Sequence, residues 1–114
     1  MCSSDLASDQ SYANMVRDAY RRSEADQTDV RYAPLISNDF KDFPSATFML
    51  AECDSFVDEG RLYAEKLRAA GVAVEINIEP GQVHHVFPWA GAFSAGPRMI
   101  DHGARALGRA LGSL

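Results

Sequence analysis

The chain has only two cysteines in 114 residues, Cys2 and Cys53. Two thiols so far apart, in a chain without a secretion signal, are weak evidence for a disulfide. We therefore expect both to be free thiols. Cys53 lies between Glu52 and Asp54, whose negative charges disfavour a thiolate, so we do not expect it to be a nucleophile.

Basic residues are also scarce: 11 lysines and arginines face 16 acids, which gives a formal net charge of −5. Phosphate backbones and anionic membrane surfaces attract positive charge, so we expect no nucleic-acid partner. No apolar run approaches the ~20 residues of a membrane span, and the N-terminus lacks a basic and then apolar signal. These absences predict a soluble, cytoplasmic protein without a membrane span.

The first seven residues, MCSSDLA, have no hydrophobic period. We expect residues 1–7 to be an artefactual or disordered leader, with the natural frame starting near Ser8 and the natural protein extending upstream. The folded domain would then occupy residues 8–114.

The rest of the chain divides into alternating elements. Apolar spacing in residues 8–22 predicts a helix. Residues 23–44 are polar and hold two prolines, which predicts a long loop packed on a surface. The run ATFMLA at 46–51 is short and continuously apolar, which is typical of a strand buried on both faces.

A second helix is predicted after this strand, because apolar residues recur at helical spacing and Gly71 is a natural stop. Arg61 and Glu65 can pair on its outer face. The stripe consists of Phe56, Gly60, Tyr63, Leu67 and Ala70.

Residues 72–79 alternate strictly between apolar and polar side chains, which predicts a strand with one dry and one partly wet face. A last helix is predicted from near Pro97, a favourable residue for the first turn. Its inward face would hold Ile100, Ala104, Leu107 and Leu111.

Strand, helix and strand form a βαβ unit, so we expect an α/β fold with parallel strands and a right-handed connection. Asp54 would then follow one strand, and His84 and His85 the next. Open α/β sheets build their sites at these carboxyl ends. A carboxylate and an imidazole there could form the acid and base of a charge-relay triad.

Two stretches resemble the C-terminal portion of α/β-hydrolase-fold esterases of the hormone-sensitive-lipase-like group. One is ECDSFVDEGRLYAEKLRAAGVAVEINIEPGQVHHVFPWAG, which resembles the turn D-P-L-x-D-E-G, then Y-A-x-x-L-x-x-A-G, a strand and P-G-x-x-H. The other, YAPLISNDFKDFPSATFML, resembles S-P-L-x-x-x-x-x-x-L-P-P. The resemblance covers about residues 30–112 and implies a βαβ-plus-helix fragment of that family's parallel sheet.

The resemblance also implies roles for individual residues. Asp54 takes the place of the triad acid, and Asp58 and Glu59 take the D-E that follows it. Counting from the Pro-Gly pair, His84 takes the place of the catalytic histidine, with His85 as an alternative one residue later. The implied activity is hydrolysis of a small-molecule ester with a short to medium acyl chain, without a cofactor or metal.

The family's serine lies in G-x-S-x-G, upstream of the acid, and neither this motif nor an HGGG-type loop occurs in the chain. AFSAG at 92–96 is a near miss, but it follows the histidines, so we interpret Ser94 as a helix cap. We therefore expect the nucleophile upstream and the 114-residue chain alone to be inactive.

Two other interpretations stay open. One is a non-catalytic, ligand-binding or receptor-like member of the same fold, which an upstream G-x-S-x-G would disfavour. The other is a self-standing βαβ interaction module. The family also implies a homodimer through residues 72–79 and the last helix, because an exposed sheet edge can pair with a second copy.

Overall fold

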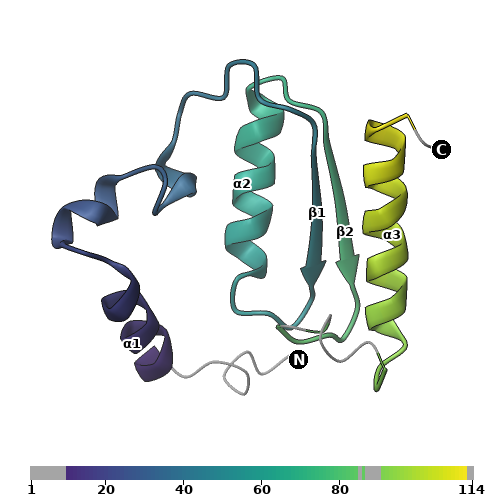
Figure 1. Ribbon diagram of the computed structural model, residues 1–114, viewed down its shortest axis with the longest axis horizontal. Helices are drawn as coiled ribbons and strands as arrows, with labels where there is room; N and C mark the ends of the chain where they lie inside the picture. Colours follow the sequence, from purple (N-terminus) through teal and green to yellow (C-terminus); the bar gives the residue numbers. More distant parts are fainter. Residues whose placement is uncertain (1–9, 85, 87–90, 113–114) are drawn as a thin grey trace.

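The computed structural model describes residues 10–84, 86 and 91–112, so the proposed leader lies outside the described residues. In Figure 1 the paired strands lie between helices, and a further helix and short 3₁₀ helices precede them in the chain. In chain order the elements are α1 (Gln10–Tyr20), η2 (Glu24–Thr28), η3 (Pro34–Ile36), β1 (Ala46–Ala51), α2 (Val57–Ala69), β2 (Val74–Glu79) and α3 (Ala95–Ala110).

The two strands are parallel and in direct register, with Ala46 opposite Val74 and Ala51 opposite Glu79. The predicted βαβ unit and its α/β class are therefore confirmed. Strand 46–51 has the predicted bounds, whereas the second strand begins two residues later than expected, at Val74. Because the strands are parallel, their carboxyl ends lie at one edge, beside the arrowheads in Figure 1.

Helix α2 covers one face of the sheet. The Phe48 ring packs on Tyr63 with centroids 6.0 Å apart, and Leu67 is fully buried. Gly60 permits close approach, since a Cβ there would lie 2.7 Å from Leu50 Cδ2. The middle of the predicted stripe is thus confirmed.

The ends of the predicted stripe, Phe56 and Ala70, are exposed. Arg61 lies 3.9 Å from Asp58 instead of pairing with Glu65. The helix stops as predicted, because Gly71 adopts φ +85° and its N–H bonds the Arg68 carbonyl.

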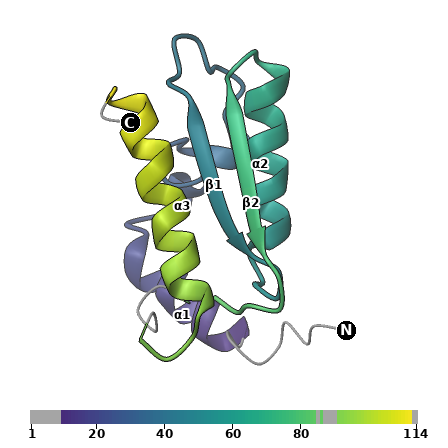
Figure 2. The same cartoon turned by 90° about the vertical axis from the view of Figure 1, so that its right-hand side faces the viewer.

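Helix α3 covers the opposite face of the sheet (Figures 1 and 2). It starts at Ala95, two residues before the expected Pro97. Its buried residues Ala95 and Met99 form a small core with Val86, against which Met49 of β1 packs.

The prediction of which residues of α3 face inward is wrong. The residues named for it, Ile100, Ala104, Leu107 and Leu111, are all exposed. The reason is the strand beneath, because β2 presents Glu75, Asn77 and Glu79 to this helix. The helix therefore turns Met99 and small residues inward, including Gly103 over Met49.

Ion pairs join β2 and α3. Glu75 lies 2.8 Å from Arg109 Nη2 and 3.0 Å from His102 Nε2, although the His102 contact lacks hydrogen-bond geometry. Arg98 Nε donates to Glu79 Oε1 at 2.9 Å. Charge complementarity therefore sets how this helix lies on the sheet.

The segment before β1 packs on α2, as the prediction of a packed loop required. Phe40 is buried, and its ring lies 6.0 Å from that of Tyr63. Lys66 Nζ donates to the Leu35 carbonyl at 2.7 Å. In the described part of the chain, no helix is long and apolar enough to cross a membrane.

Candidate active site

Asp54 and His84 meet at the carboxyl edge of the sheet. Asp54 follows the end of β1 by three residues, and His84 follows the end of β2 by five. Asp54 Oδ2 lies 2.7 Å from His84 Nδ1, across a sequence separation of 30 residues. The two side chains that sequence analysis placed on neighbouring loops are thus in direct contact.

Asp54 is held by the turn that begins α2. Its Oδ1 accepts the Phe56 N–H at 2.9 Å, and its carbonyl accepts the Val57 N–H at 3.2 Å. One carboxylate oxygen therefore shapes the turn while the other binds the imidazole. The side chain is only 14% exposed, so the carboxylate is largely shielded from water.

The His84 ring is 34% exposed and lies against Phe56, with ring centroids 5.4 Å apart. An ionised carboxylate can only accept hydrogen bonds, so Nδ1 carries the proton of the neutral ring when it faces Asp54. The lone pair is then on Nε2. This is the tautomer that a general base of the triad type requires.

Hydrogen bonds from the backbone and from one side chain also connect the Asp54 loop to the His84 loop, at the residues that precede Asp54 and His84 in each loop. The Glu52 N–H donates to the Glu79 carbonyl at 3.1 Å, and the Cys53 N–H donates to the Gln82 carbonyl at 2.8 Å. The Glu52 carboxylate accepts the Gly81 N–H at 2.7 Å. Glu52 was not among the predicted site residues, and its only signal in the sequence is an acid two residues before Asp54.

Cys53 is disulfide-bonded in the structure, so the prediction that it is a free thiol is wrong. Sequence separation was a poor guide because it does not measure distance in the fold. The prediction for Cys2 lies outside the described residues, as does His85, the alternative histidine.

Ser94 immediately precedes α3, where a cap was predicted, but its side chain makes no capping hydrogen bond. Its Oγ instead accepts from Arg98 Nη1 at 3.1 Å. Asp58 and Glu59 are exposed in the first turn of α2, where negative charge favours the helix dipole. Within the described ranges, no group of three or more His, Cys, Asp or Glu side chains could hold a metal ion.

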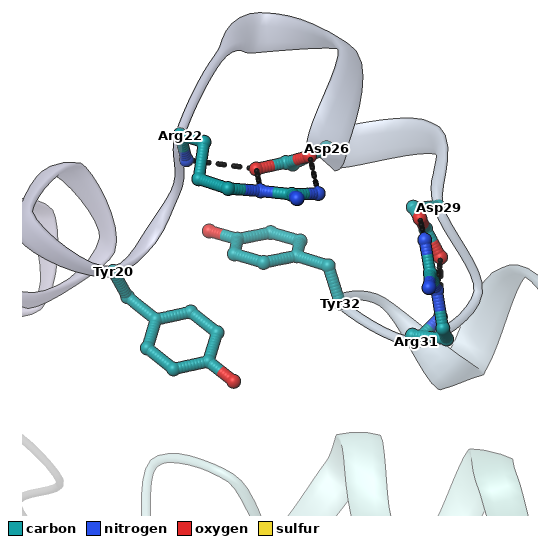
Figure 3. Close-up of a pocket in the computed structure, with 6 residues that line it drawn as sticks. All are labelled: Tyr20, Arg22, Asp26, Asp29, Arg31 and Tyr32. Carbon is teal, nitrogen blue, oxygen red and sulfur yellow. Dashed lines mark hydrogen bonds and ion pairs between the residues drawn. The ribbon is translucent and has the colours of Figure 1, made fainter.

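A separate open cavity of about 360 Å³ lies in the segment between α1 and η3. Figure 3 shows the Arg22–Asp26 and Arg31–Asp29 pairs with Tyr20 and Tyr32 below and beside them. The Arg31 hydrogen bonds lower the pKa of Asp29 to about 2. None of the residues that line this cavity comes from the Asp54 or His84 loop.

Comparison with known proteins identifies similar proteins of one fold. A protein family described as alpha/beta hydrolase fold matches residues 3–88. Ethyl acetate hydrolase of Pseudomonas putida is 38% identical over 65 residues, which are 57% of this chain and 20% of that protein. Carboxylesterase NlhH of Mycobacterium tuberculosis is 41% identical over 73 residues, or 64% of this chain and 23% of that protein.

Solved structures give the same result. EstE1, a thermostable carboxylesterase from a metagenomic library, superposes with a TM-score of 0.78 at 27% identity, over 90% of this chain and 36% of that one. An ester hydrolase from the metagenome of Lake Arreo gives 0.76 at 34% identity, over 82% and 30%.

This chain belongs to the alpha/beta hydrolase fold family. The predicted resemblance to esterases of that fold is confirmed. The chain spans 20% and 23% of the length of the two curated relatives named above.

Proposed function

We propose that the complete protein hydrolyses carboxylic esters through a Ser-His-Asp triad in which Asp54 is the acid and His84 the base. The observation that carries the proposal is the 2.7 Å contact between Asp54 Oδ2 and His84 Nδ1 at the carboxyl edge of the sheet. The names of the relatives, ethyl acetate hydrolase and carboxylesterase, support the reaction class. The serine would come from sequence upstream of this chain, and no cofactor would be needed.

In this mechanism Asp54 keeps the Nδ1 proton in place, so that Nε2 of His84 can take the proton of the serine hydroxyl. The serine oxygen attacks the carbonyl carbon, and the imidazolium then gives its proton to the departing alkoxide. Water releases the acyl group by the same steps. Asp54 acts by fixing the tautomer and stabilising the imidazolium, without itself becoming protonated.

The test uses the complete gene product with p-nitrophenyl acetate. Asp54→Asn and His84→Ala should each lower kcat by about 10³- to 10⁴-fold, because the ring loses its tautomer or is lost altogether. His85→Ala should have a much smaller effect, and Glu59→Gln is the control for a nearby acid. If activity survived His84→Ala but not His85→Ala, the catalytic base would be His85 and not His84.

A complete protein that binds esters but turns none over would contradict the proposal and favour the non-catalytic, ligand-binding alternative. The upstream sequence gives a second check, since a G-x-S-x-G motif is required for the triad. We also propose that residues 1–114 alone do not hydrolyse esters. If residues 1–114 alone hydrolysed esters and Ser94→Ala abolished that activity, the upstream serine and the inactivity of this chain would both be contradicted.

We further propose that the complete protein forms a homodimer through β2 and α3. The support is an exposed apolar stripe on α3, in which Leu107 is 60% and Leu111 70% exposed. Among the described residues β2 pairs with β1 alone, so its other edge has unpaired backbone groups.

A further inference from the structure

Glu52 connects the loop that carries Asp54 to the loop that carries His84. Its carboxylate Oε2 accepts the Gly81 N–H at 2.7 Å, across 29 residues of sequence. We propose that Glu52 is a positioning residue, whose carboxylate fixes the turn at Gly81 and thereby the distance between His84 and Asp54. This inference rests on the proposed triad for its kinetic consequence, and on the hydrogen bond for its structural one.

The contacts between the loop after β1 and the loop after β2 follow the order of the residues in both loops. The Glu52 N–H binds the Glu79 carbonyl, the Cys53 N–H binds the Gln82 carbonyl, and Asp54 binds His84. Between the first two of these contacts, the His84 loop makes a turn at residues 80–81. The Glu52 side chain holds that turn, so it fills the one interval that the backbone contacts leave open.

The chemistry of the turn makes the Gly81 N–H the donor that Glu52 holds. Proline has no N–H, so Gly81 supplies the first backbone donor after β2 ends. Gly81 has φ +67°, a left-handed conformation that glycine adopts readily. A carboxylate that accepts a backbone N–H makes a stronger bond than a neutral acceptor. Glu52 therefore favours one conformation of this turn, in addition to the bond that Gln82 Nε2 donates to the Pro80 carbonyl at 3.3 Å.

The turn lies three residues before His84, so its conformation sets where the imidazole lies. The 2.7 Å contact with Asp54 tolerates little displacement, and an error of about 1 Å in a catalytic group can cost about 100-fold in rate. Glu52 itself is exposed. Its loss should therefore reduce catalysis while leaving the stability of the fold almost unchanged.

The test compares three variants of the complete protein. Glu52→Met keeps the length of the side chain but removes the acceptor, and Glu52→Gln keeps a neutral acceptor. Glu59→Met is the matched control, since Glu59 is an exposed acid in the same region. Glu52→Met should lower kcat for p-nitrophenyl acetate by about 10- to 100-fold with little change in KM. Glu52→Gln should recover most of the loss, and Glu59→Met should behave as wild type.

Hydrogen exchange at the Gly81 amide gives a readout that needs no activity. The amide should exchange faster in Glu52→Met than in wild type or Glu59→Met, with the urea unfolding midpoint unchanged. This measurement separates the two proposals: a protein without esterase activity would refute the triad, yet altered exchange at Gly81 would still support Glu52 as the residue that fixes the turn.

Three results would overturn the inference. One is unchanged exchange at Gly81 in Glu52→Met. Another is Glu52→Gln as impaired as Glu52→Met, because the amide oxygen can still accept the N–H. The third is a rise in KM with kcat unchanged, which would make Glu52 a substrate contact instead.

Discussion

Arg98 of α3 forms an ion pair with Glu79, the last residue of β2, and thereby ties the two ends of the segment that carries His84. Arg98 Nε donates to Glu79 Oε1 at 2.9 Å, and Arg98 Nη1 also donates to Ser94 Oγ. The Glu79 side chain is only 9% exposed, whereas that of Arg98 is 58% exposed. A carboxylate buried to this degree needs its partner, because an unpaired buried charge is costly.

Arg98→Met should therefore destabilise the protein by about 1–3 kcal/mol, since it removes the charged donor that the Glu79 carboxylate has among the described residues. Glu79→Gln should cost less, because the amide oxygen still accepts from Arg98. Urea unfolding of the complete protein measures both. The control is Arg105→Met, which removes an exposed pair with Asp101 on the same helix and should leave the midpoint nearly unchanged. Equal midpoints for Arg98→Met and Arg105→Met would contradict the prediction.

Sequence patterns predicted those elements whose burial follows from their own residues. The continuous apolar run of β1 gave correct bounds, because a strand covered on both faces needs no polar side. The orientation of α3 could not be predicted in this way. Its most apolar stripe points outward, since the β2 face beneath it carries Glu75 and Glu79, which attract Arg109 and Arg98.

In the candidate site, too, some features could be predicted from the sequence and others depend on contacts that the sequence does not reveal. The contact between Asp54 and His84 could be predicted because topology brings the carboxyl ends of parallel strands together. Glu52 could not, because a side chain that binds a backbone N–H leaves no residue-type signal at its partner Gly81. The disulfide at Cys53 was missed because two cysteines far apart in sequence say nothing about their distance in space.

Asp29 should titrate with a pKa of about 2, well below the usual 3.8, because the Arg31 side chain and backbone donate hydrogen bonds to its carboxylate. A lowered folded-state pKa means that the contribution of Asp29 to stability is complete above about pH 4 and is lost as the pH falls through 2. Carboxyl ¹³C NMR measures the midpoint directly. Arg31→Met should move it back toward 3.8, and a wild-type midpoint near 4 would refute the ion pair in solution.

Phe56 should support the orientation of His84, because its ring lies against the imidazole while its backbone N–H binds Asp54. Phe56→Ala keeps the backbone bond and removes the ring, so we expect kcat to fall by about threefold to tenfold. Phe56→Leu should restore part of the loss. Phe93→Ala, which removes another exposed ring, is the control for general effects of aromatic deletion. Full activity in Phe56→Ala would mean that Asp54 alone fixes the imidazole.

Leu107→Glu should convert the proposed dimer to a monomer, because it places a charge in the middle of the exposed apolar stripe of α3. The stripe includes Ile100 and Leu111, and no described residue covers it. A buried carboxylate without a partner would make association through this face unfavourable. Leu62→Glu is the matched control, since Leu62 is an exposed leucine on α2, which covers the opposite face of the sheet. Sedimentation at micromolar concentration should show dimers for wild type and Leu62→Glu, and monomers for Leu107→Glu. A monomeric wild type would contradict the proposed dimer. A dimer that tolerates Leu107→Glu would show that the interface does not include this stripe of α3.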